Sequence, residues 1–153
     1  MHRHLLMTCA VLSLLVWVSV GCGEEARAEP GVSGADTAKE FSTKVVAAKI
    51  KSGAQGQATI SILPGKGFKW NKEYPAKVTF EGAPKHVALA KTQLKQFGGD
   101  FKTTDKRADI LVKMTGKAAG KETLTAKAKF SVCNDTTCVI REASLNISVD
   151  VTK

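Results

Sequence analysis

Histidine is scarce in this 153-residue chain, and its scarcity argues against two kinds of site. The chain has three histidines; two lie within the first four residues, and only His86 lies further along. A Ser-His-Asp triad depends on histidine, and a structural zinc site needs four nitrogen or sulfur ligands. The sequence also lacks a Gly-rich phosphate-binding loop. We therefore expect neither a hydrolase nor a structural zinc protein, and we expect no cofactor.

Long apolar runs are absent except for one near the N-terminus, at residues 5–20. This run follows a short basic start and is somewhat shorter than the roughly 20 apolar residues that a spanning helix needs. Small and acidic residues follow it, where a permanent membrane helix would have a basic flank. This layout predicts a secretory signal peptide, and hence export from the cytoplasm.

Two cleavage sites compete at the end of this run. The sequence SVGC at residues 19–22 resembles the lipobox of bacterial lipoproteins, in which Cys22 would be lipidated and become the mature N-terminus. The alternative is the A-x-A site at residues 26–28, which would release a soluble periplasmic or secreted protein by cleavage after Ala28. The lipobox lies directly after the apolar run, so we favour a membrane-anchored lipoprotein that faces the periplasm.

The predicted domain boundaries follow from the lipobox. Residues 1–21 are the signal peptide, residues 22–40 are a tether rich in Gly, Ala and Glu, and residues 41–153 are the folded domain. A tether is expected between a lipid anchor and a folded domain.

Arginine-rich clusters are also missing, although the formal net charge is +9. The basic residues are mostly lysines spread singly along the chain, whereas nucleic-acid binders more often cluster arginine with aromatic residues. We expect no nucleic-acid partner, and interpret the lysines as a solvated surface that protects strand edges from aggregation.

Short β-branched segments separated by Gly, Pro, Asn and Asp fill the rest of the chain, and each is typical of a strand. These predicted strands are residues 43–50, 58–63, 76–80, 86–90, 108–114, 122–133 and 138–151. Apolar and polar residues alternate plainly in the last two, as expected for antiparallel sheet with one buried face. Residues 90–97 could form a single helical turn. The pattern predicts an all-β fold, an immunoglobulin-like antiparallel β-sandwich of about seven to eight strands.

Two cysteines, Cys133 and Cys138, flank a polar four-residue loop between the last two predicted strands. Asn134 and Asp135 favour a turn, so a hairpin is expected to place the cysteines opposite each other, close enough for a disulfide. An exported protein would form that bond. Closing so short a loop stabilises the fold by only about 2 kcal/mol, and an exposed bond at a hairpin tip is open to thiol attack. However, most disulfides in exported proteins are structural, so the residues alone favour a structural bond.

The cysteine hairpin, together with the upstream GFKWNKEYP at residues 67–75, resembles the periplasmic N-terminal domain of the thiol:disulfide interchange protein DsbD. This resemblance implies an immunoglobulin-like fold in which Cys133 and Cys138 are a redox pair. It also implies that Phe68 and Trp70 are aromatic neighbours of the pair and that Phe97 shields it. The implied partner is a periplasmic thiol protein or a thioredoxin-like protein.

Two functions therefore remain open. In the first, the cysteine pair takes part in periplasmic thiol–disulfide exchange. In the second, the protein is a non-catalytic immunoglobulin-like envelope lipoprotein, structural or partner-binding, in which the same disulfide is only a staple. Whether the protein is an enzyme depends on which of these is right.

Overall fold

The computed structural model describes residues 40–153. The predicted signal peptide, the lipidation site Cys22, the cleavage site at Ala28 and all of the predicted tether except Glu40 lie outside the described residues. Within the described part, no helix is long and apolar enough to cross a membrane.

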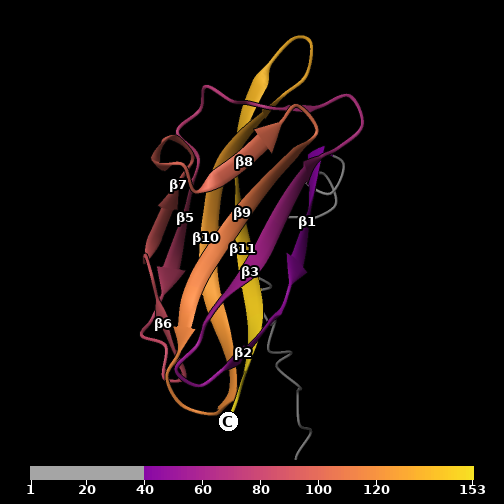
Figure 1. Ribbon diagram of the computed structural model, residues 1–153. Helices are drawn as coiled ribbons and strands as arrows, with labels where there is room; N and C mark the ends of the chain where they lie inside the picture. The colour runs from indigo at the N-terminus through magenta and orange to yellow at the C-terminus, as the bar shows by residue number, and fades with distance from the viewer. Residues whose placement is uncertain (1–39) are drawn as a thin grey trace, which may run out of the picture. The chain divides into compact units, whose positions relative to one another are not determined.

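Two β-sheets make up the described part of the chain (Figure 1). The first sheet, called sheet A, contains five strands: β1 (Phe41–Val46), β3 (Gln55–Pro64), β6 (Val87–Leu89), β8 (Phe101–Thr104) and β9 (Arg107–Gly116). The second, sheet B, contains six: β2 (Ala48–Lys51), β4 (Lys69–Trp70), β5 (Lys77–Glu81), β7 (Gln93–Lys95), β10 (Gly120–Cys133) and β11 (Cys138–Thr152). A single 3-10 turn, η1 (Gln96–Gly98), follows β7.

The order of the strands is that of an immunoglobulin-like sandwich. Sheet A runs β1-β3-β9-β8, with β6 on the same edge of β9 as β8, and sheet B runs β2-β11-β10-β5-β7. These orders correspond to the A-B-E-D and C-F-G sheets of immunoglobulin-type domains. All pairings between the described strands are antiparallel except that of β2 with β11, which is parallel. The predicted fold class is confirmed.

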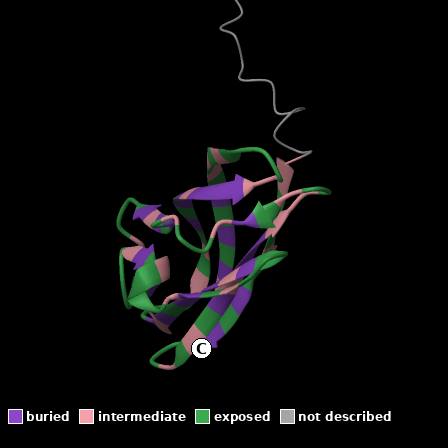
Figure 2. Cartoon of the chain, turned by 90° about the horizontal axis from the view of Figure 1, so that it is seen from above, coloured by how far each residue is buried: buried purple, intermediate pink, exposed green. Residues whose placement is uncertain are grey.

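Alternation of side chains builds the core between the sheets. Buried and exposed residues succeed each other along the long strands, visible as alternating bands in Figure 2. The largest fully buried side chains come from both sheets: Phe130, Ile60, Ile62, Ile110, Leu145 and Ile147. The apolar positions that the sequence pattern assigned to one face of residues 122–133 are indeed the buried ones: Leu124, Ala126, Ala128, Phe130 and Val132.

One predicted strand, at residues 43–50, is in fact two strands in different sheets. β1 pairs with β3 in sheet A, the chain crosses at Ala47, and β2 pairs with β11 in sheet B. No Gly or Pro marks this crossing, because the change of sheet is set by the two partner strands rather than by a local turn.

The region of the predicted helical turn, residues 90–97, contains the short strand β7 and the beginning of η1. Gly99 ends η1 in the left-handed conformation, with φ 77°, and its N–H donates to the carbonyl oxygen of Gln96. β7 forms because three of its residues pair with β5, an interaction that local sequence does not encode. Two further short strands, β4 and β8, were not predicted for the same reason.

Candidate functional site

The β10–β11 hairpin ends at the two cysteines. Its ladder runs without interruption from the Gly120–Val151 pair to the Cys133–Cys138 pair, and a disulfide joins these cysteines, whose Cα atoms are 3.9 Å apart. Asn134 organises the four-residue loop: its side-chain oxygen accepts hydrogen bonds from the backbone N–H groups of Thr136 (3.0 Å) and Thr137 (2.8 Å). The predicted hairpin and its disulfide are both confirmed.

The disulfide lies at the end of the domain opposite the C-terminus (Figure 1). Cys133 is half-buried and Cys138 is exposed, and three of the four loop residues are exposed as well. On the other side of Cys133, its cross-strand neighbour is the exposed Lys69 of β4. The disulfide therefore lies at a solvent-accessible tip, and the neighbouring strand carries a cationic side chain. Sequence reasoning did not identify Lys69, because it lies far from Cys133 along the chain.

Aromatic side chains fill the core below this tip. Trp70, only 3% exposed, pairs with Val132, the residue before Cys133, and stacks on Phe130 with ring centroids 5.4 Å apart. The ring of Phe41 packs edge-on against Phe130, with ring centroids 4.9 Å apart. Phe68 is half-buried and packs against the same core. Trp70 thus lies in the core beside the residue that precedes Cys133, and the role of Phe68 and Trp70 as neighbours of the cysteine pair stays a prediction.

Gln96 is a structural residue that sequence reasoning missed. Its side-chain oxygen accepts a hydrogen bond from the indole Nε1 of Trp70 (2.7 Å). Its amide nitrogen donates to the backbone oxygens of Lys72 (2.6 Å) and Tyr74 (3.1 Å). These bonds fasten η1 to the segment between β4 and β5. Nothing in the local sequence distinguishes Gln96 from other polar residues.

Phe97 follows Gln96 in η1, and its side chain is 70% exposed. It lines a groove together with Tyr74, Lys77 and Lys129, and neither cysteine is among the residues lining that groove. The structure therefore brings Phe97 to the outer face of sheet B. The shielding role implied by the family resemblance stays a prediction.

An ion pair fixes the start of the described chain near the hairpin. Arg141 of β11 donates from Nε and Nη2 to the two carboxylate oxygens of Glu40, the second contact being 2.7 Å long. The hydrogen bond from Arg141 holds the pKa of Glu40 below its usual value. Glu40 is thus attached to the folded domain.

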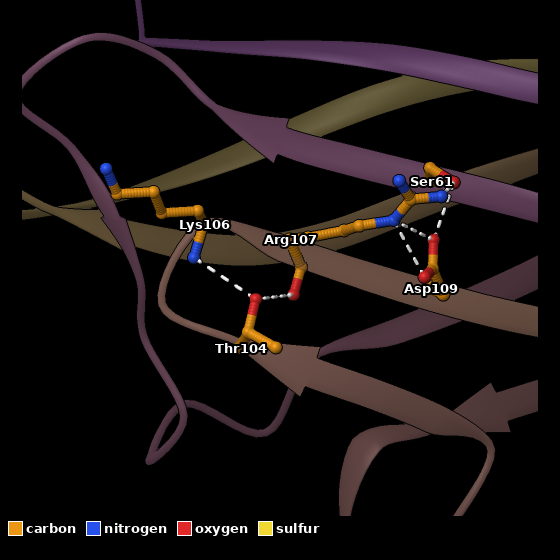
Figure 3. Close-up of polar contacts among 5 residues, drawn as sticks. All are labelled: Ser61, Thr104, Lys106, Arg107 and Asp109. Carbon is orange, nitrogen blue, oxygen red and sulfur yellow. Dashed lines mark hydrogen bonds and ion pairs between the residues drawn. The ribbon is translucent and has the colours of Figure 1, made fainter.

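The outer face of sheet A carries a second polar cluster, shown in Figure 3. Ser61, only 1% exposed, donates to Asp109 (2.6 Å), and Arg107 donates from Nε to both oxygens of that carboxylate (2.7 Å each). Burial raises the pKa of Asp109, but the hydrogen bonds from Ser61 and Arg107 outweigh it, and the net pKa is lowered.

This cluster is not arranged for nucleophilic catalysis. Ser61 is buried, and the Nη2 of Arg107 donates to its hydroxyl oxygen (3.0 Å). Activation of a serine needs a neighbouring base, usually histidine. His86 instead contacts the backbone oxygen of Ala118 through Nδ1 (3.1 Å). Among residues 40–153, no group of three or more His, Cys, Asp or Glu side chains is arranged to hold a metal ion.

Comparisons with known proteins add little to this description. No protein-family model and no curated protein matches the sequence. Among solved structures, the chain is similar to domains 4 and 5 of the S-layer protein SbsC, with TM-score 0.36 and 13% identity over 74% of this chain and 51% of that one. It therefore spans about half the length of that structure.

Two other solved structures show a similarity of the same order. One is AggA, the major subunit of aggregative adherence fimbriae type I from Escherichia coli, with TM-score 0.37 and 9% identity over 73% of this chain and 95% of that one. The other is a PapD-like domain of human CEP192, with TM-score 0.36 and 6% identity over 72% of this chain and 85% of that one. At these scores the similarities carry no functional argument, and the assignment of this chain as an immunoglobulin-like all-β sandwich rests on its own strand pairing.

Proposed function

We propose that this protein is an exported lipoprotein, anchored at Cys22 and facing the periplasm, whose Cys133–Cys138 disulfide exchanges with thiols of a partner protein. The observation that carries the proposal is the location of the bond at a solvent-accessible hairpin tip, where Cys138 is exposed. The resemblance to the N-terminal domain of DsbD supports it. The expected partner is a periplasmic thiol protein or thioredoxin-like protein that carries two thiols.

The difference in exposure assigns the two sulfurs different roles. A partner thiolate attacks the Sγ of Cys138, the S–S bond breaks, and Cys133 leaves as a thiolate with the electron pair. The partner's second thiolate then attacks the partner sulfur of this mixed disulfide, and Cys138 leaves as a thiolate. Both thiolates take up protons, so the domain gains two electrons and two protons while the partner's dithiol becomes a disulfide.

Lys69 favours the first of these steps. It is the cross-strand neighbour of Cys133 on β4, and a nearby ammonium group stabilises a thiolate. A leaving group whose thiolate is more stable leaves faster.

The rest of the hairpin also argues for a reactive rather than a supporting bond. Its 14 cross-strand pairs already hold the two strands together, and the loop closes with a hydrogen bond from the N–H of Asn134 to the carbonyl oxygen of Thr137 (2.9 Å). A disulfide that closes a loop of about six residues adds only about 2 kcal/mol to such a structure.

The alternative function is a non-catalytic immunoglobulin-like envelope protein, structural or partner-binding, with the disulfide as a local staple. The fold suits this function equally well, because sandwiches of this type serve many binding roles. The two alternatives differ in the stability of the disulfide toward reduction.

The reduction potential of the Cys133–Cys138 bond is the decisive measurement. A value near −200 mV supports exchange, whereas a value below about −300 mV, typical of structural disulfides, would overturn it.

Trapping in cells provides the second test. The Cys133→Ala variant keeps the exposed Cys138 and should retain mixed disulfides, and Cys138→Ala should retain fewer. If neither variant retains any, the exchange proposal fails.

A further inference from the structure

Three lysines form a row across the outer face of sheet B. Lys77 of β5 lies in the middle of this row. Its cross-strand partner on one side is Lys95 of β7, and its partner on the other side is Lys129 of β10. Like charges directly opposite each other in a sheet are destabilising. Lys129 has an acidic partner, Glu142, at 3.1 Å. Within residues 40–153, no acidic side chain forms an ion pair with Lys77 or Lys95.

A neighbouring lysine on the same face has an acidic partner. Lys127, two residues before Lys129 on the same face of β10, forms an ion pair with Glu81 at 2.9 Å. Lys77 and Lys95, which face each other on β5 and the edge strand β7, therefore differ from Lys127 and Lys129 of β10, which both have acidic partners.

A groove of about 570 Å³ lies along the lysine row. Its lining includes three lysines, two aromatic residues and a glutamine, together with small and apolar residues: Lys77, Lys95, Lys129, Tyr74, Phe97, Gln93, Pro75, Ala76 and Gly98. Phe97 is the most exposed aromatic wall of this groove, and the hydrogen bonds of Gln96 to the β4–β5 segment hold its turn in place. An exposed aromatic side chain on a fixed turn, beside unpaired charges, is typical of a recognition surface.

We propose that this groove binds an acidic segment of a partner protein. An apolar side chain of that segment lies against Phe97 and Tyr74, and its carboxylates face Lys77 and Lys95. Charge complementarity selects this occupant, because the segment supplies the negative charge that the lysine row lacks. The interaction is independent of whether the disulfide is redox-active.

The test uses a labelled acidic peptide with one central phenylalanine flanked by Asp and Glu, and measures its binding to the protein by fluorescence anisotropy. Lys77→Glu combined with Lys95→Glu should weaken binding by about tenfold or more, because attraction becomes repulsion. The matched control is Lys44→Glu combined with Lys113→Glu. Both lysines are exposed residues of sheet A, so this variant changes the net charge of the protein by the same amount but away from the groove. The control should weaken binding by less than about twofold at a salt concentration of about 0.15 M, where distant charges are screened.

Phe97→Ser tests the apolar half of the groove and should weaken binding by about fivefold, because this ring no longer covers the apolar side chain. Replacing the phenylalanine of the peptide by serine should have a similar effect. Equal losses in the two double-lysine variants would mean non-specific charge attraction and would overturn the proposal. The proposal would also be overturned if the protein bound vesicles with about 30% anionic lipid through Lys77 and Lys95 but did not bind the peptide.

Discussion

Gln96 connects three parts of the domain through one side chain. It accepts the indole hydrogen bond of the buried Trp70 and donates to two backbone oxygens of the β4–β5 segment. Trp70 in turn contacts the ring of Phe130 below the disulfide. The position of the aromatic cluster under the hairpin tip therefore depends on a polar residue far from it in sequence.

We predict that Gln96→Ala lowers the free energy of unfolding by about 1–3 kcal/mol, because the indole N–H of Trp70 loses its acceptor in a buried position. Urea denaturation measures the change. Gln57→Ala is the control, since Gln57 is an exposed residue of β3, and its effect should stay within about 0.5 kcal/mol. Equal stability of the two variants would contradict the role assigned to Gln96.

Residues such as Cys133 and Cys138 were predictable because a turn sequence between two strands places them opposite each other. The roles of Gln96 and Lys69 were not, because both depend on contacts with segments more than 20 residues away. Contacts of this kind leave no periodicity in the sequence.

At the scale of elements, the hairpin of β10 and β11 is the longest ladder among the described strands. Its strands were recognised from the alternation of apolar and polar residues, which is strongest where one face is buried and the other is exposed. The short strands β4, β7 and β8 contain two to four residues each, too few for alternation to be recognised. They exist because longer neighbours offer unpaired backbone groups.

We predict that the double variant Cys133→Ser/Cys138→Ser keeps the fold and loses about 2 kcal/mol of unfolding free energy, the chain-entropy value for so short a loop. Far-ultraviolet circular dichroism checks that the fold is kept, and urea denaturation measures the loss of unfolding free energy. The same difference should separate the oxidised wild-type protein from the reduced wild-type protein, which tests the bond without a substitution. Complete unfolding of the double variant would show that the ladder alone does not hold the hairpin.

At the scale of the whole domain, several carboxylates ionise more easily than usual. The hydrogen bond from Arg141 lowers the pKa of Glu40. Burial raises the pKa of Asp100 and of Asp109, but their hydrogen bonds to Lys91 and to Ser61 and Arg107 outweigh burial, and both are lowered overall. A lowered folded-state pKa contributes stability that is present above the unfolded pKa, about 4, and is lost as the pH falls through the folded value. The domain should therefore lose stability in acid.

We predict that Glu40→Gln lowers the free energy of unfolding by about 1 kcal/mol at pH 7, because a partly buried ion pair with Arg141 is lost. The difference from wild type should shrink as the pH falls below about 4, where Glu40 becomes protonated in the wild type. Thermal or urea unfolding at several pH values measures it. Glu73→Gln, at an exposed position, should match wild type throughout; an equal effect at Glu73 would contradict the assignment.

The ion pair between Glu40 and Arg141 also lies close to the disulfide along β11. Arg141 is only three residues beyond Cys138, so the chain that precedes Glu40 joins the domain within about 10 Å, measured along β11, of the more exposed cysteine. Under the proposed exchange reaction, a thiol partner that reaches Cys138 would therefore also come close to the Glu40–Arg141 ion pair.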